Sequence, residues 1–336
     1  MLYVGLDVHL KQSTYCILDD NGKRVKTHTV KGPWDAMVKE IAKIKSPFKI
    51  VFEATTGYGQ LYDWLCKSAE TVQVAHPGQT RLIFRSKRKN DRIDAQKLAK
   101  LLYLDAVPTT HVPSADMRAW RRLIEFRHWQ VRSRTRTKNQ IRALLRRHAV
   151  SAPRRLWNRK GVAWLETLTF PSSEAALERD LLVDALLRAA AVIGRIEKDL
   201  NRRAAQHPGV TLLRTIPGVG VRTAEAFVAY VDRPKRFGRI AAAGSYFGLV
   251  PCQDASAGKN RLGHITQQGP STVRQLLGEA AWQAVRRCPE IRAYFERIAK
   301  GAPERRKIAI VATAHYLARM MLSMLKTGET CRFAAA

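Results

Sequence analysis

Short apolar runs and polar turns alternate over residues 1–112. Apolar runs at 2–8, 13–18, 24–30, 49–53 and 71–75 predict strands, and Asp19-Asp20-Asn21-Gly22 is typical of a turn between two of them. Segments 34–45, 58–69 and 91–104 repeat apolar residues every three or four positions, which predicts helices. Three strands in a meander, followed by strands that alternate with helices, predict an α/β domain with a mixed sheet.

The pattern changes at Pro113. A sparse helical stripe comes first, formed by Trp120, Leu123, Ile124, Val131, Ile141, Leu144 and Leu145. A clearer one follows, with the spacing of a coiled-coil seam: Leu177, Leu181, Ala185, Ala189, Val192, Ile196 and Leu200. These stripes predict two antiparallel helices joined around 153–171, so residues 113–208 are interpreted as a basic coiled-coil hairpin that forms a dimer.

Residues 209–336 predict a mainly α-helical third domain. Helices are expected at 239–247, 271–287, 290–300 and 304–326, with a polar loop over 251–269. The turn Ile216-Pro217-Gly218-Val219-Gly220 resembles a helix-hairpin-helix turn, whose backbone N–H groups contact phosphate; an ordinary helix end is the alternative. The turn lacks the GK[ST] ending of a nucleotide-binding loop, so ATP use is not supported.

The net positive charge of the chain limits the classes of partner that it can be expected to bind. The chain of 336 residues carries 59 Lys and Arg against 28 Asp and Glu, a formal net charge of +31, which calls for a polyanionic partner. Nucleic acid is expected, with an anionic membrane surface as the rival; no apolar run approaches the ~18–20 residues of a spanning helix. The five cysteines are scattered and lack CxxC spacing, so reduced thiols and a cytoplasmic location are expected.

Basic residues concentrate between 114 and 150, where eleven Lys and Arg face two acids, and Trp120, Phe126 and Trp129 lie between them. This composition favours contact with a nucleic-acid backbone, with a solvated basic face as the alternative. Lys87-Arg88-Lys89 is a second cluster. The predicted nucleic-acid-binding residues are Arg118, Arg121, Arg122, Arg127, Arg132, Arg134, Arg136, Lys138, Arg142, Lys259 and Arg261.

Four acids are candidates for metal binding. Asp7 lies in an apolar strand, Glu53 closes another strand, and Asp91 and Asp94 share one face of a helix. If the fold brings them together, their charges require a cation, and hard oxygen ligands suit magnesium or manganese. The alternatives are helix N-terminal acids stabilised by the dipole and a strand-end cap.

Three motifs carry a resemblance. Gly5-Leu6-Asp7-Val8-His9, Glu53-Ala54-Thr55-Thr56-Gly57 and Asn90-Asp91-Arg92-Ile93-Asp94-Ala95 resemble the signatures of the DEDD transposases of insertion sequences, which include Piv-type DNA invertases and bridge-RNA-guided recombinases. The resemblance implies an RNase H-like (RuvC-like) N-terminal domain over 1–112. It also implies that Asp7, Glu53, Asp91 and Asp94 form a tetrad that binds Mg²⁺, with Mn²⁺ as an alternative.

The C-terminal half resembles the second transposase domain, through Ile216–Gly220, Phe247-Gly248-Leu249-Val250-Pro251, Ser256-Ala257-Gly258-Lys259 and Gly263-His264-Ile265-Thr266. In the family, a serine of this region attacks a DNA phosphodiester and forms a phosphoserine intermediate. The resemblance implies that Ser256 is the matching nucleophile. Small neighbours of Ser256 allow a backbone to approach, although solvent exposure alone is the simpler explanation of a loop serine. Ala257 stands where many relatives have glycine, and Ser245 is the next candidate.

The resemblance thus implies a recombinase that acts on donor and target DNA, with a structured guide RNA, as a homodimer or tetramer. Three rivals remain: a Piv-type invertase without guide RNA, a RuvC-like metal-dependent nuclease that resolves junctions, and a non-catalytic RNA-binding protein with a degenerate nuclease fold.

Overall fold

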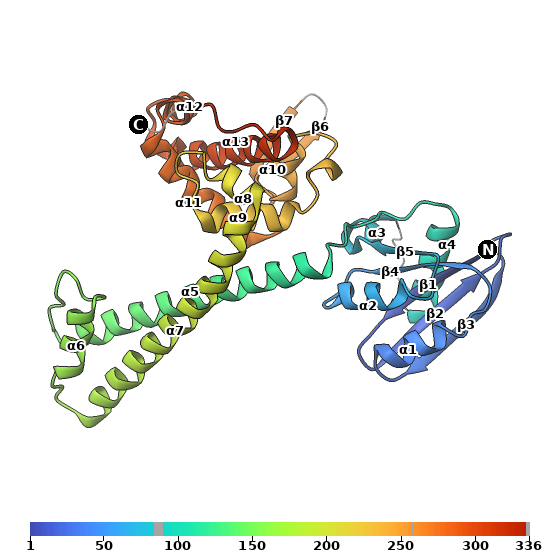
Figure 1. Ribbon diagram of the computed structural model, residues 1–336, viewed down its shortest axis with the longest axis horizontal. Helices are drawn as coiled ribbons and strands as arrows, with labels where there is room; N and C mark the ends of the chain where they lie inside the picture. Colours follow the sequence, from blue (N-terminus) through green and yellow to red (C-terminus); the bar gives the residue numbers. More distant parts are fainter. Residues whose placement is uncertain (84–89, 257–258, 334–336) are drawn as a thin grey trace. The chain divides into compact units, whose positions relative to one another are not determined.

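The computed structural model describes residues 1–83, 90–256 and 259–333, and for 255, 256, 259 and 260 it describes the backbone alone. The chain divides into two compact units, Met1–Arg118 and Ala119–Ala336 (Figure 1). The expected three-part division at 112 and 208 stays a prediction. Lys87-Arg88-Lys89 lies outside the described residues.

A five-stranded mixed sheet forms the centre of the first unit, with strand order β3-β2-β1-β4-β5. β1 pairs antiparallel with β2 and parallel with β4, β2 pairs antiparallel with β3, and β4 pairs parallel with β5. The strands are β1 (Leu2–Val8), β2 (Gln12–Leu18), β3 (Arg24–Lys31), β4 (Phe48–Glu53) and β5 (Thr71–Ala75). This confirms the expected α/β character; the RNase H-like assignment stays a prediction.

Helices cover both faces of this sheet (Figure 1). On one face Met37 and Ile41 of α1 and Leu61 and Leu65 of α2 pack in the same core cluster as β1 and β4. On the other face α4 packs with Ala95, Leu98, Ala99 and Leu102. The helices are α1 (Trp34–Ile41), α2 (Tyr58–Leu65), α3 (Pro77–Ile83) and α4 (Asp91–Tyr103). Successive residues of each strand therefore point alternately into the core under α1 and α2 and into the core under α4. This alternation determines which side chains of the strands face α4.

The second unit contains the hairpin of two long helices, α5 (Ala115–Arg147) and α7 (Ser173–Gln206), where α5 begins at the end of the first unit. A short helix, α6 (Arg159–Thr167), packs between their ends, with Leu165 fully buried. The buried row of α7 includes Val183, Leu186 and Ile193, whereas Leu177 and Leu181 are 58% and 57% exposed. The predicted buried row is thus wrong at the N-terminal end of α7. This helix carries apolar residues on two faces, and the face that packs inward is not the predicted one.

The remainder of the second unit is mostly helical, as expected. Its helices are α8 (Pro208–Leu213), α9 (Val221–Val231), α10 (Ala242–Tyr246), α11 (Ser271–Arg287), α12 (Pro289–Ala299) and α13 (Arg306–Thr327), with short 3-10 helices η1 (Pro234–Arg236) and η2 (Pro303–Arg305). The expected polar loop instead forms an antiparallel hairpin of β6 (Pro251–Ser256) and β7 (Lys259–Ile265). The loop prediction was wrong because polar composition hid a strand pair that is joined by only two residues.

One helix corrects the hydropathy analysis. The segment Pro303–Thr327 is long and apolar enough to cross a membrane, judged by length and composition alone. Within the unit, however, α13 packs against α8, α10, α11 and α12. Leu317, Ala318, Met321 and Leu322 of α13 are fully buried, so the apolar character of this helix is explained by its place in the core.

Candidate metal centre and nucleic-acid interface

Gly5 brings the candidate metal ligands together. A Cβ atom on Gly5 would lie 2.2 Å from the backbone oxygen of Ala95 and from the backbone nitrogen of Ala99. Only a residue without a side chain lets α4 rest directly on β1 at this point. The first turn of α4, with Asp91 and Asp94, is thereby held over the end of β1, where Asp7 lies two residues beyond Gly5 on the same face.

The sheet register places Glu53 beside Asp7. β1 and β4 are parallel, and Leu6 is the Cα partner of Phe52, so Asp7 and Glu53 follow at the same ends of neighbouring strands. Leu6 and Phe52 are both buried in the core on the α1 and α2 side. The next residue in each strand therefore points to the α4 side. Glu53 thus shares its face with Asp7.

A histidine joins the acids. His9 Nε2 lies 3.4 Å from Asp7 Oδ2 and 4.0 Å from Asp91 Oδ1, and Asp7, His9 and Asp91 form a group whose ligand atoms all lie within 4.8 Å of one another. The predicted tetrad did not include His9. The signal was its place in the chain, because two residues after Asp7 an extended chain returns to the same face. Trp34 Nε1 donates a hydrogen bond to the His9 carbonyl at 3.1 Å and fixes the backbone there.

Neighbouring polar side chains hold the two acids of α4. Gln12 Nε2 donates a hydrogen bond of 3.2 Å to Asp91 Oδ2, and Lys97 Nζ forms a 3.0 Å ion pair with Asp94 Oδ1. Asn90 caps the helix by accepting from the Arg92 N–H. Asp94 therefore has a cationic partner on its own helix, whereas Asp91 faces Asp7 and His9.

The charge on Asp7 is disfavoured. Its side chain is 22% exposed, and the pKa of its carboxyl is raised, chiefly by burial, while His9 lowers the pKa and Asp91 and Asp94 raise it. Two further carboxylates thus oppose the ionisation of Asp7, so a divalent cation would stabilise the ionised cluster. Carboxylate oxygens suit magnesium or manganese, and the donor set fits such an ion; an imidazole nitrogen is a softer ligand than magnesium prefers.

The candidate nucleophile lies in the second unit. Ser256 is the last residue of β6, and its Cα partner across the hairpin is Lys259. The Ser256 and Lys259 side chains lie outside the described residues. Arg261 and His264 are exposed on β7, where Arg261 is the partner of Asp254. Ser245, the second candidate, is exposed on α10.

Several of the basic residues predicted to bind nucleic acid have internal partners. Arg118 pairs with Asp63, and Arg127 Nε donates to Glu197 Oε1 at 2.8 Å. Arg121 donates to the carbonyls of Ala229 and Tyr230 at the end of α9. Lys138 and Arg142 lie over the Trp157 ring. Their role in nucleic-acid binding stays a prediction, as it does for Arg122, Arg134 and Lys259.

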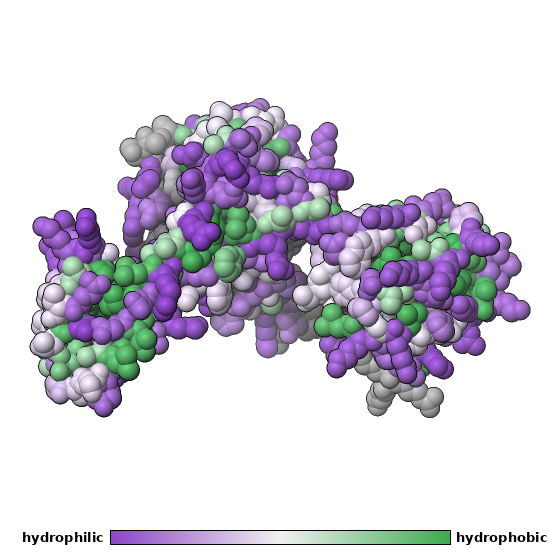
Figure 2. All heavy atoms as spheres, turned by 60° about the horizontal axis from the view of Figure 1, so that its bottom comes forward, coloured by the Kyte–Doolittle hydropathy of each residue, from purple (hydrophilic) through white to green (hydrophobic). Residues whose placement is uncertain are grey.

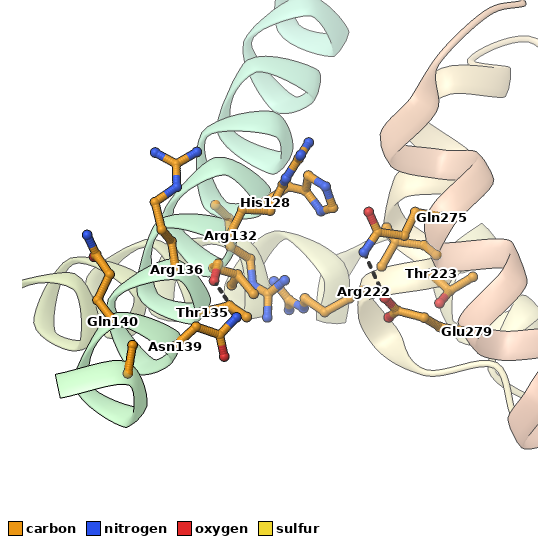
Figure 3. A pocket seen from close by; sticks show the side chains of 14 residues that line it. His128, Arg132, Thr135, Arg136, Asn139, Gln140, Arg222, Thr223, Gln275 and Glu279 are labelled. Atoms are coloured by element: carbon orange, nitrogen blue, oxygen red, sulfur yellow. Dashed lines mark hydrogen bonds between the residues drawn. The ribbon is translucent and has the colours of Figure 1, made fainter. Parts of the chain in front are cut away.

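Arg132 and Arg136 line a groove of about 830 Å³ between α5, α9 and α11 (Figure 3). His128 on the same wall has a lowered pKa, first because it is buried and then because of Arg132, so its ring is neutral at pH 7. Across the groove lie Gln275 and Glu279, joined by a 3.0 Å hydrogen bond. Exposed guanidinium groups beside amide side chains suit a phosphate backbone.

The surface is consistent with this picture. In Figure 2 hydrophilic residues cover most of the visible face, and hydrophobic ones gather in patches along the hairpin helices. The exposed large apolar side chains on these helices are Phe126, Trp129, Leu177, Leu181 and Leu187. Phe126 and Trp129 stack with ring centroids 6.2 Å apart.

Two family models match the chain. Residues 4–150 match a DEDD model described as "Transposase", and residues 210–296 match a model described as "Transposase IS116/IS110/IS902 family". The first covers the acidic cluster, and the second covers the hairpin that carries Ser256.

Curated relatives agree with these matches. The chain is 27% identical to a probable family 20 transposase of Pseudomonas aeruginosa, over 88% of this chain and 89% of the relative. It is 26% identical to the transposase for insertion sequence element IS1111A of Coxiella burnetii, over 99% of this chain and 92% of the relative. A transposase for insertion sequence element IS1328 of Yersinia enterocolitica is 27% identical over 70% of each chain.

Proposed function

We propose that the chain is a DEDD transposase of the IS110 family, which the two family models and the transposase relatives support. It would be a recombinase that cuts and rejoins DNA through a covalent phosphoserine intermediate. A transposase of this kind would carry out DNA cleavage and strand transfer. The observation that carries the proposal is the convergence of Asp7 and Asp91, 84 positions apart in the sequence, on one cation-binding group. The mixed sheet under this group supports an RNase H-like assignment.

The acidic cluster would hold a divalent metal ion. Asp7, Glu53, Asp91 and Asp94 are the proposed ligands, and magnesium, or manganese, bound there supplies positive charge beside the scissile phosphate. Two features of the chain favour metal binding at this site. Gln12 orients Asp91, and burial raises the pKa of Asp7, so that the ionised cluster gains most from a cation.

Ser256 would carry the covalent step. Its Oγ loses the hydroxyl proton and forms a bond to the phosphorus atom, while the bond from phosphorus to one ester oxygen of the DNA backbone breaks. That oxygen takes up a proton as a hydroxyl group, so no proton is gained or lost overall. The energy of the phosphoester bond is kept for rejoining. Lys259, the Cα partner of Ser256, and Arg261 are suited to neutralise the charge that develops on the phosphoryl oxygens.

Nucleic acid would occupy the basic surface of the second unit. Arg132 and Arg136 border a groove of about 830 Å³, where they are suited to contact a phosphate backbone, and the net charge of +31 favours donor and target DNA as well as a structured guide RNA. Two exposed leucines on α7, Leu177 and Leu181, suit contact with another copy, which supports a homodimer or tetramer. A cytoplasmic location is part of this proposal.

A hydrolytic nuclease is the second candidate. The group of Asp7, His9 and Asp91 is complete within the first unit and does not require Ser256. In that case water, activated at the acidic cluster, would cleave a DNA junction without an adduct. A Piv-type invertase would use Ser256 but no guide RNA.

Adduct trapping separates these candidates. Purified protein with its copurified RNA, magnesium and labelled DNA that spans the element's junction is run on a denaturing gel. A covalent band that maps to Ser256, disappears with Ser256→Ala and persists with Ser245→Ala is the expected result. Ser245 is a matched control because it is an exposed serine on a helix of the same unit.

Other outcomes assign the alternatives. Cleavage that continues in Ser256→Ala without an adduct would overturn serine chemistry and leave a metal-dependent nuclease. An adduct that forms equally well after RNase treatment would support an invertase without guide RNA. Loss of all cleavage in Asp7→Asn with an intact fold is expected under each of these mechanisms.

A further inference from the structure

A second groove, of about 1240 Å³, lies where the turn between α8 and α9 meets α11 (elements labelled in Figure 1). Gly218 in this turn has a φ of +90°, and a Cβ atom there would lie 2.4 Å from the backbone nitrogen of Ala284 on α11. The turn is therefore pressed against the helix and cannot move away without losing this packing. This contact holds the two walls of the groove in a fixed relation.

The groove concentrates unpaired positive charge. Four of its lining residues are arginines: Arg214, Arg286, Arg287 and Arg306. In the described part of the chain none of the four forms an ion pair with a carboxylate, and the one acid that lines the groove, Glu279, accepts a hydrogen bond from Gln275. In the neighbouring groove two of the four lining arginines, Arg127 and Arg222, have carboxylate partners. Arg306 does lie over the Phe295 ring, 5.8 Å from its centroid, but a ring does not neutralise its charge. Guanidinium groups without carboxylate partners at a concave surface favour an anionic ligand.

An aromatic ring lies among these arginines. Trp282 on α11 lines the groove and is 36% exposed. Its ring is supported by Phe295 of α12, with centroids 5.8 Å apart and an interplanar angle of 54°. Phosphate contacts alone do not require an exposed aromatic ring, whereas stacking on a nucleobase uses one. Inside a duplex the neighbouring base pairs cover the faces of each base, so free base faces are typical of an unpaired strand.

We propose that this groove binds an unpaired nucleic-acid strand, with the arginines at the phosphates and Trp282 stacked on a base. The ligand chemistry, a phosphodiester backbone with a free base face, is common to DNA and RNA. The site goes beyond the proposed recombination chemistry, since it contains neither Ser256 nor any member of the acidic cluster.

Binding in EDTA tests the proposal without any cleavage. Fluorescently labelled 12-nucleotide dT and rU oligomers and a duplex of the same length are titrated with the full chain at several salt concentrations. The variants are Arg286→Gln/Arg287→Gln and Trp282→Leu. The control is Arg154→Gln/Arg155→Gln, which removes an equally adjacent pair of exposed arginines that line none of the described grooves.

The expected effects differ between the variants. Arg286→Gln/Arg287→Gln should weaken binding of the single strand and reduce the slope of log K against log salt by about 1.4, since each lost phosphate contact contributes ~0.7 for single strands. Trp282→Leu should weaken single-strand binding roughly tenfold without changing that slope, with recovery in Trp282→Phe, and should leave the duplex affinity unchanged. The control should retain wild-type single-strand affinity within about twofold, as for solvated charges.

Photo-crosslinking identifies the residue that contacts the base. Oligomers that contain 5-iodouracil should crosslink to Trp282, and the comparison of dT with rU assigns DNA or RNA as the preferred source. Equal losses of affinity in the arginine variant and its control would overturn the proposal, as would equal losses for strand and duplex in Trp282→Leu. Because neither metal nor Ser256 takes part, failure here leaves the adduct experiment unaffected.

Discussion

The backbone nitrogen of Ala99 lies 2.2 Å from the position that a Cβ atom on Gly5 would occupy. This approach between strand and helix is what sets the first turn of α4 above Asp7. A methyl group at position 5 must push α4 away from β1, because both obstructing atoms belong to the backbone and cannot rotate aside.

Gly5→Ala should therefore destabilise the first unit by about 1–3 kcal/mol and weaken metal binding at the same time. Urea denaturation and Mn²⁺ titration measure the two effects. Gly194→Ala is the control, since a Cβ atom at this position on α7 meets nothing within 4 Å, and its helix should gain up to ~1 kcal/mol. Gly5→Ala with unchanged stability would contradict the packing argument.

Asp7→Asn should have opposite effects with and without metal. Burial raises the pKa of Asp7 in the folded state, so the folded protein holds the Asp7 proton more tightly than the unfolded chain does. The free energy of unfolding therefore falls as the pH rises from the ordinary pKa of an aspartate through the raised pKa of Asp7. Removing the charge should therefore raise the Tm of metal-free protein at pH 7.

The metal-dependent part of the stability should disappear in the same variant. Wild-type protein is expected to gain about 2.7 kcal/mol at a metal concentration one hundred times the Kd, and Asp7→Asn should gain much less. Thermal melts with EDTA and with MgCl₂ provide the comparison. Asp35→Asn is the control, because Asp35 is an exposed acid that pairs only with Lys39 among the described contacts. Equal metal stabilisation in Asp7→Asn and Asp35→Asn would exclude Asp7 as a ligand.

Glu225 should make the stability of the second unit depend on pH. It is 1% exposed on α9, and burial raises its pKa to about 7, although Arg222 at 2.9 Å lowers it. Its Oε2 atom has no hydrogen-bond partner in the described part of the chain. Because the folded-state pKa exceeds the ordinary glutamate pKa of 4.5, the stabilising protonated form is lost as the pH rises from about 4.5 through 7.

Glu225→Gln should remove this pH dependence. The difference in unfolding free energy between variant and wild type should shift by roughly 3 kcal/mol in favour of the variant between pH 4.5 and pH 8, as expected for a pKa change of this size. Urea denaturation at both pH values measures it. Glu304→Gln, on an exposed 3-10 segment, serves as the reference. Parallel pH profiles for wild type and Glu225→Gln would sink this prediction.

The exposed leucines of α7 should mediate self-association. Leu177→Glu/Leu181→Glu places two charges on this surface and should shift the protein toward monomer, since burying unpaired charges in an interface is costly. Light scattering after size exclusion gives the mass. Leu10→Glu/Leu104→Glu alters two leucines that are 80% and 56% exposed in the first unit and should leave the mass unchanged. A wild-type mass for the α7 variant would place the interface elsewhere.

The strands and helices around the acidic cluster were predictable because their periodicity is strong. β1 and the start of α4 occur where the apolar pattern placed them, since each has one face that must be buried. The contact between them was not predictable in the same way. Nothing in local periodicity says that Gly5 meets Ala99, because this approach depends on the tertiary packing of α4 on the sheet.

In the second unit the site residue was predicted, but the secondary structure around it was not. Ser256 was singled out by resemblance, but its surroundings were misread as a loop, because polar strands exposed on both faces carry no alternation of apolar residues. His9 was missed although it lies in the first motif, since a histidine after a strand has many ordinary explanations. On α7, two apolar faces made the buried row ambiguous, and packing against α5 and α6 decided it.

The β6–β7 hairpin has a further consequence for genetics. Residues 251–254 and 261–264 are exposed, so few substitutions there would remove buried surface or unfold the protein. Loss of transposition in a mutational scan of these positions would therefore report on function, with little contribution from misfolding. Selection on the β6–β7 hairpin therefore acts on its contacts with binding partners. Selection on β1 acts both on the stability of the fold and on the activity of the acidic cluster.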